Sequence, residues 1–101
     1  MFARVSTYRI EDADKLRAGF DHVTGPLEEV DGFDGAYFLL DRDGGKAISI
    51  TLWDDEATLK SSIEKANQLR QSAVSEGGGS IESVDHYEVA LTAGPVARAA
   101  R

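Results

Sequence analysis

The two histidines, His22 and His86, are the side chains best suited to acid–base chemistry, because an unperturbed imidazole titrates near neutral pH. His22 lies beside the apolar stripe of a predicted helix. It is a candidate base for a pocket, or else a half-exposed polar neighbour of the core. His86 stands between Asp85 and Tyr87, and we expect it to face solvent or an interface. Two histidines so far apart do not have the spacing of metal ligands, and we therefore expect no metal site.

Two aromatic residues are candidates for binding a ring-shaped ligand. Trp53 is the only tryptophan and ends a predicted strand, where it either lines a pocket or packs in the core over the following helix. Tyr37 also lies on a predicted strand. Its hydroxyl either binds a phenolic ligand or is satisfied within the protein while the ring packs. Tyr37 and His22 are thus the two candidates for a catalytic role.

Several classes of protein are excluded by what the sequence lacks. The chain has no cysteine, which rules out thiol catalysis, disulfides and cysteine-ligated metal clusters. No G-x-S-x-G motif supports a serine hydrolase, and the glycines at 77–79 follow a helix instead of opening one, as a phosphate-binding loop would. With 18 acidic and 11 basic residues, a net charge of −7 makes nucleic acid a poor partner. No apolar run is long enough to cross a membrane.

A central hairpin must position any site in so short a chain. Residues 36–40 and 47–53 are rich in aromatic and β-branched residues and predict two strands, joined by a glycine-containing turn at 41–45. In the second strand one face carries Ile48, Ile50 and Leu52, and the other carries Ala47, Ser49, Thr51 and Trp53. Neither face is charged, so we expect both to be covered.

The remaining elements predict one domain over residues 1–91. We expect a strand at 2–10, a helix to about residue 24 followed by a short helical turn after Gly25-Pro26, a second helix at 55–75 and a last strand at 81–91. The order β-α-β-β-α-β predicts an α+β, ferredoxin-like fold, a four-stranded antiparallel sheet with two helices on one face. The bare sheet face predicts a homodimer formed through it. Residues 92–101 are expected to be a flexible tail.

The sequence resembles the antibiotic biosynthesis monooxygenase (ABM) family of dimeric α/β barrels. The likeness rests on residues 32–37, on Ile48 to Asp54, on the acidic helix start at 54–57 and on Tyr87-Glu88-Val89. The family includes cofactor-free oxygenases of anthrones and quinols, haem-degrading enzymes and proteins of no known activity. The resemblance implies a pocket between helices and sheet, and we expect its ligand-binding residues to be Trp53, Tyr37, Phe20, Thr51 and Ile63.

The resemblance implies an oxygenase more than a haem enzyme. Haem-degrading relatives place a histidine on the second helix about ten residues past the tryptophan, where this chain has Ile63. Without that ligand a haem has no axial nitrogen, and we expect no cofactor. The expected function is a cofactor-independent monooxygenase acting on a small aromatic, quinol- or anthrone-like substrate. The alternative is a non-catalytic dimeric ligand-binding or structural protein of the same fold. The first residues lack the basic start and apolar run of a signal peptide, and we expect a cytoplasmic protein.

Overall fold

The structure, a computed structural model, describes residues 1–94 of the chain. Its elements follow one another in the order β1 (Phe2–Ile10), α1 (Ala13–Glu28), β2 (Phe33–Asp41), β3 (Lys46–Trp53), α2 (Glu56–Ser61), α3 (Ile63–Gly77) and β4 (Gly79–Glu88). The predicted tail, residues 92–101, lies mostly outside the described residues.

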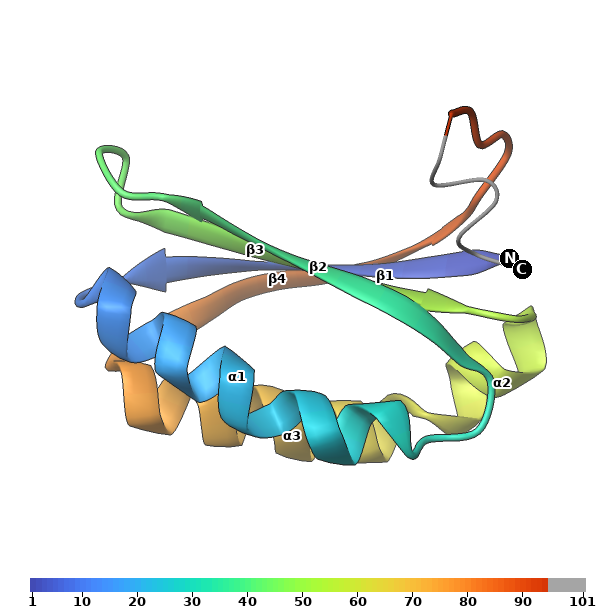
Figure 1. Cartoon of the computed structure of the whole chain (residues 1–101), viewed down its shortest axis with the longest axis horizontal. Coiled ribbons are helices and arrows are strands. Elements are labelled where there is room, and N and C mark those ends of the chain that lie inside the picture. Colours follow the sequence, from blue (N-terminus) through green and yellow to red (C-terminus); the bar gives the residue numbers. More distant parts are fainter. Residues whose placement is uncertain (95–101) are drawn as a thin grey trace.

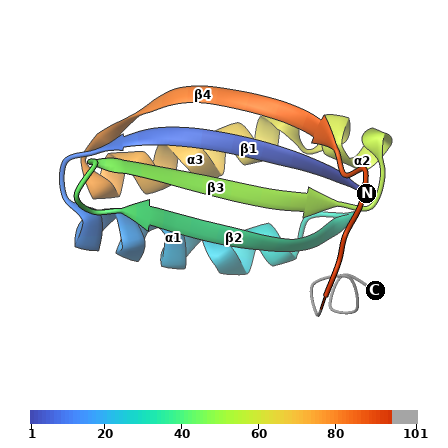
Figure 2. The same cartoon turned by 90° about the horizontal axis from the view of Figure 1, so that it is seen from above.

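The four strands form one antiparallel sheet in the order β2-β3-β1-β4, with β1 and β3 in the middle. Helices α1, α2 and α3 lie on one face of it, as Figure 1 shows, and the view from above in Figure 2 looks onto the other face. This arrangement confirms the predicted ferredoxin-like fold. The register places Ile50 of β3 between Val5 of β1 and Tyr37 of β2.

The face of the sheet without helices, called the outer face below, is largely apolar in its middle. Alternation along the strands and the register place on it the side chains of Val5, Tyr37, Leu39, Ile48, Ile50, Leu52 and Tyr87. Tyr37 and Leu39 are each 45% exposed and Tyr87 is 54% exposed, which is unusual for a row of large apolar side chains.

The core lies between the sheet and the helices. Along α1 an apolar stripe is buried, consisting of Leu16, Phe20, Val23 and Leu27. The ring of Tyr8 meets that of Phe20 at 5.3 Å between centroids. Trp53 packs in a second cluster with Leu27 and Leu59. Phe38 and Leu69 pack against both clusters and so connect them.

Helix α1 differs from the prediction at its end, because it continues through Pro26 to Glu28. Proline lacks an amide hydrogen and costs a helix one hydrogen bond, but here it falls in the last turn. The burial of Leu27, one turn beyond Val23, favours continuing the helix. At the other end, the Asp12 side chain caps the helix by accepting from the Lys15 amide at 3.1 Å, as the acidic start predicted.

The second predicted helix is in fact two, α2 and α3, which meet at Ser62. The Ser62 hydroxyl donates to the Leu59 carbonyl at 2.7 Å, and the same carbonyl accepts from Nη2 of Arg4 at 2.9 Å. Side chains therefore satisfy this carbonyl at the break. The last strand also differs from the prediction, since β4 begins at Gly79 and ends at Glu88.

Candidate functional site

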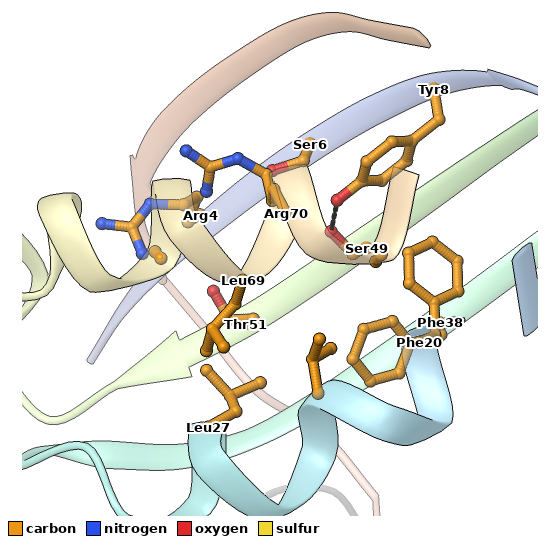
Figure 3. A pocket seen from close by; sticks show the side chains of 13 residues that line it. Arg4, Ser6, Tyr8, Phe20, Leu27, Phe38, Ser49, Thr51, Leu69 and Arg70 are labelled. Carbon is orange, nitrogen blue, oxygen red and sulfur yellow. Dashed lines mark hydrogen bonds between the residues drawn. The ribbon is translucent and has the colours of Figure 1, made fainter. Parts of the chain in front are cut away.

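A small cavity lies between the sheet and the two long helices (Figure 3). Its volume is about 30 Å³, enough for one or two water molecules. β1, β3, α1, α3 and β2 supply its lining, which consists of Arg4, Ser6, Tyr8, Phe20, Val23, Leu27, Phe38, Ser49, Thr51, Ala66, Leu69, Arg70 and Ala73.

The sheet provides five of the six polar residues of the lining, and α3 provides the sixth, Arg70. Arg4, Ser6 and Tyr8 occupy every second position of β1, and Ser49 and Thr51 do the same on β3, so that all five face the helices. The Tyr8 hydroxyl and Ser49 Oγ are 2.8 Å apart and hydrogen-bonded. Burial raises the pKa of Tyr8, which keeps its phenol protonated and able to donate.

Arg4 is the most unusual residue of the cavity, because only 2% of it is exposed. Its Nη2 donates to the Leu59 carbonyl and, at 3.1 Å, to Ser62 Oγ. Its Nε donates to Nε2 of His86 at 3.1 Å. Its Nη1 is buried without a hydrogen-bond partner. Burial, and secondly the charge of Arg70, lowers the pKa of Arg4 to about 10.

Arg70 and His86 lie next to this guanidinium. Arg70 projects from α3, donates to Oδ1 of Asn67, and has its pKa lowered by burial. His86 accepts from Arg4, and burial, followed by the charges of Arg4 and Arg70, lowers the pKa of its imidazole. A neutral imidazole can accept at Nε2, as this contact requires. One end of the cavity is therefore cationic.

The other end is aromatic. The rings of Phe20 and Phe38 are 4.8 Å apart and inclined at 32°, and they lie away from the two arginines in Figure 3. The same two rings also line a more open hollow of about 200 Å³ between α1 and β2, together with Arg17, Asp21, Thr24 and Leu40. The pair thus separates the cavity from the open hollow.

The structure brings only two of the predicted ligand-binding residues to the cavity, Phe20 and Thr51. Trp53 faces the helices as well, but it is 0% exposed and packs beyond the cavity, where its Nε1 donates to Thr51 Oγ1 at 2.9 Å. Tyr37 points the other way, onto the outer face. Ile63, 38% exposed, does not line the cavity either.

The catalytic candidate His22 also lies elsewhere. Its Nδ1 is 2.8 Å from the Glu76 carboxylate on the exposed side of α1 and α3, and this hydrogen bond raises the pKa of His22. Tyr37, the other candidate, is on the wrong face of the sheet for this cavity. The structure therefore removes both from its vicinity.

Sequence reasoning missed Arg4, Ser6, Tyr8 and Arg70 as site residues. A usable pattern was present, since Arg4, Ser6 and Tyr8 share one face of the first strand. Polar residues at alternate positions, on the face that helices must cover, indicate a polar cavity inside the core.

No metal site and no membrane span are found in the part of the chain that the structure describes. Across residues 1–94, no group of three or more His, Asp or Glu side chains could hold a metal ion. Nor is any helix in that range both long enough and apolar enough to span a membrane.

No protein-family model matches the sequence. Among curated proteins, uncharacterized protein Rv2558 of Mycobacterium tuberculosis is 31% identical over 71 residues, which is 70% of this chain and 30% of that protein. Uncharacterized protein Rv2557 of the same organism is 29% identical over 83 residues, 78% of this chain and 37% of that protein. The chain thus spans about a third of the length of these relatives.

Solved structures match over most of the chain. SnoaB of Streptomyces nogalater, a cofactor-independent oxygenase, has a TM-score of 0.66 at 14% identity and covers 93% of this chain and 96% of its own. The monooxygenase ActVA-Orf6 of Streptomyces coelicolor, in complex with nanaomycin D, has a TM-score of 0.69 at 18% identity. The match covers 93% of this chain and 91% of the ActVA-Orf6 chain. The heme-degrader MhuD of M. tuberculosis, with two hemes bound, has a TM-score of 0.69 at 19% identity. The match covers 93% of this chain and 100% of the MhuD chain. The chain therefore has the fold of the ABM monooxygenases, which the heme-degrader shares.

Proposed function

We propose that this protein is a cofactor-independent monooxygenase of a small aromatic, quinol- or anthrone-like substrate, which binds in the cavity between sheet and helices. The observation that carries the proposal is the composition of that cavity. It joins the aromatic walls Phe20 and Phe38 to the buried hydroxyls of Tyr8 and Ser49. The fold shared with SnoaB and ActVA-Orf6 supports the same reaction class.

The reaction needs little equipment from the protein. An anthrone methylene and one O₂ give a carbonyl and one water: one oxygen atom enters the substrate, and the other leaves with the two hydrogens. The ionised substrate itself supplies the electrons. The chain's part is to stabilise the anion with fixed donors, such as the protonated Tyr8 hydroxyl, and to exclude bulk water.

Access for a ring system requires the Phe20–Phe38 pair to move. A cavity of about 30 Å³ is far below the ~300 Å³ of typical small-molecule sites. The hollow of about 200 Å³ lies on the other side of the two rings. Rotation of Phe38 would join the two spaces and give an aromatic substrate an entrance between α1 and β2.

Oxygen consumption tests the proposal. With 1,8-dihydroxyanthrone or a naphthoquinol, wild-type protein is expected to consume O₂ faster than protein-free autoxidation, with saturation in substrate. Phe38→Trp should lower this rate at least tenfold, because the larger ring keeps the entrance closed, while Tyr87→Phe, far from the cavity, should not change it. An oxygen electrode with anaerobic pre-incubation measures both. Saturable binding without turnover would contradict the enzyme proposal.

One observation favours the non-catalytic alternative. No histidine, aspartate or glutamate is among the cavity-lining residues, all of which lie within the described chain. A ligand-binding protein needs no such base. The alternative therefore predicts binding in this same cavity with no O₂ uptake above background.

We also propose that two copies pair through their outer faces. The row of exposed apolar side chains is the supporting observation, because faces of this kind on soluble chains mark interfaces. Stacked sheets about 10 Å apart would bury it from both sides.

Ile50→Glu should convert this dimer to a monomer. Ile50 lies in the middle of the outer face, between Val5 and Tyr37, so that two like charges would meet across the interface. Light scattering should give about twice 10.9 kDa for the wild type and 10.9 kDa for the variant. Gln68→Glu, on the exposed side of α3, adds the same charge and should remain dimeric. A wild-type mass of one chain at micromolar concentration would refute the pairing.

A further inference from the structure

We infer that Arg4 and Arg70 form an anion-binding site at the cationic end of the cavity, which takes one oxyanion carried on an aromatic ring system, either a carboxylate or an ionised enol. This inference deepens the proposed function, because it names the charge and the anchoring group of the ligand. It is tested by binding alone and does not depend on turnover.

The first observation is that one nitrogen of the buried Arg4 guanidinium has no hydrogen-bond partner. A guanidinium that is 2% exposed is expected to have every nitrogen paired, because an unpartnered buried polar group is costly. Nε and Nη2 of Arg4 are paired with protein groups, but buried Nη1 has no partner. Nη1 carries two hydrogens, and the residue lines the cavity. A hydrogen-bond acceptor bound in the cavity would supply the partner that Nη1 lacks.

The second observation is that no protein carboxylate neutralises this end of the cavity. The chain has a net charge of −7, yet the cavity lining includes two arginines and no acidic residue. The ion pairs found within residues 1–94 all involve other cations, namely Arg9, His22, Arg42 and Lys60. Residues 95–101 contain no Asp or Glu. Two neighbouring cations in an acidic protein thus face the cavity without a counter-ion.

A purely structural role explains only part of this arrangement. Arg4 holds the junction of α2 and α3 through the Leu59 carbonyl and Ser62, and its guanidinium lies 5.5 Å from the centroid of the Trp53 ring. Those contacts use one of its two terminal nitrogens. They account neither for free Nη1 nor for Arg70, whose charge further disfavours the cation of Arg4. A bound anion would both pair with Nη1 and offset the repulsion between the charges of Arg4 and Arg70.

The cavity also defines how such a ligand would lie. Figure 3 shows the two arginines on one side, with Leu27, Phe20 and Phe38 on the other. An oxyanion at Arg4 therefore directs the attached rings toward the apolar wall and the Phe20–Phe38 pair. A neutral ligand of the same shape would bury the rings equally well, but it would leave the two arginine charges without a counter-ion.

Calorimetric titration with matched ligands tests the inference. At pH 7 the ionised 2-hydroxy-1,4-naphthoquinone is compared with its neutral 2-methoxy ether, and 2-naphthoate with neutral 2-naphthamide. The absence of cysteine removes thiol addition to the quinone as a side reaction. We expect each anion to bind wild-type protein at least tenfold more tightly than its neutral partner. Preference in only one pair would assign the site to an enolate or to a carboxylate.

Arg4→Met should reduce the preference for anions to about one, because methionine fills similar space without charge. Arg70→Gln should reduce the preference for anions in part. This second variant tests the inference even when Arg4→Met does not fold. Arg9→Met is the matched control, since this arginine lies on the same strand but pairs with Glu82 at the surface, and the preference should persist.

Equal binding of anion and neutral partner by the wild type would overturn the inference, as would a preference that survives both Arg4→Met and Arg70→Gln. These results are separable from the test of the proposed function. Anion-selective binding without O₂ uptake would refute the oxygenase alone. O₂ uptake above background together with equal binding of the anion and its neutral partner would refute the anion site alone.

Discussion

Replacing Trp53 with alanine is expected to lower the free energy of unfolding by about 3–5 kcal/mol, the range for deleting a large buried aromatic ring. Trp53 is 0% exposed and packs against Leu27 and Leu59, with the Phe33 ring 5.7 Å away edge-on. Its removal leaves a void, and the loss of its Nε1–Thr51 hydrogen bond adds to the cost.

Chemical denaturation of three variants separates core packing from ligand contact. Trp53→Phe keeps a ring and should cost about 1–2 kcal/mol, with ligand affinity unchanged, because Trp53 does not line the cavity. Ile63→Ala, at a 38%-exposed position of α3, should cost less than about 1 kcal/mol. A weakened affinity in Trp53→Phe at unchanged stability would make the tryptophan a pocket residue after all.

Gly19→Ala is the second substitution with a large expected effect. We expect it to destabilise the protein, although replacing a helical glycine with alanine usually stabilises. In an exposed helix this change stabilises by up to about 1 kcal/mol. Here a Cβ at Gly19 would lie 2.6 Å from the backbone oxygen of Ala73, where α1 crosses α3. The helices would have to separate, and we expect a net loss of about 1–3 kcal/mol, as for other overpacked cores.

Gly25→Ala provides the control within the same helix. A Cβ there meets no atom within 4 Å, so that only local backbone effects remain. Because Pro26 follows and disfavours a helical conformation at the residue before it, the usual gain is reduced, and we expect a change below about 1 kcal/mol in either direction. Thermal melts of both variants measure the difference. Equal melting temperatures would contradict the close helix crossing.

The fold was predictable because its elements have strong local patterns. The alternation of Ile48, Ile50 and Leu52 with polar and small residues set both faces of β3, and the stripe along α1 set its buried side. The break between α2 and α3 was not predictable. It depends on Ser62 and on Arg4, which is distant in sequence and reaches the Leu59 carbonyl only once the sheet has formed.

The site was predictable only where alternation could be tied to a face. The position of Thr51 at the cavity follows from the alternation along β3, and that of Phe20 follows from the apolar stripe of α1. For Tyr37 the sequence left the face of its strand open, because the pairing of β2 with β3 is irregular between Phe33 and Gly35 and the register beyond that point decides which side chains of β2 point toward the helices. His22 is adjacent to buried Val23, but the helical turn of about 100° per residue carries it to the surface.

The contact between Arg4 and Trp53 has a practical consequence. Trp53 is the only indole in the chain, and the Arg4 guanidinium carbon lies 5.5 Å from the centroid of its ring. A positive charge over an aromatic face interacts with its π-electrons, and an anion bound to that charge alters the field across the ring. The emission of the protein is therefore expected to report anion binding at the inferred arginine site without any added label. Rapid-mixing fluorescence with benzoate, a single-ring carboxylate that does not absorb at the red edge of the indole band, would give the association and dissociation rates directly when excitation is set at that edge.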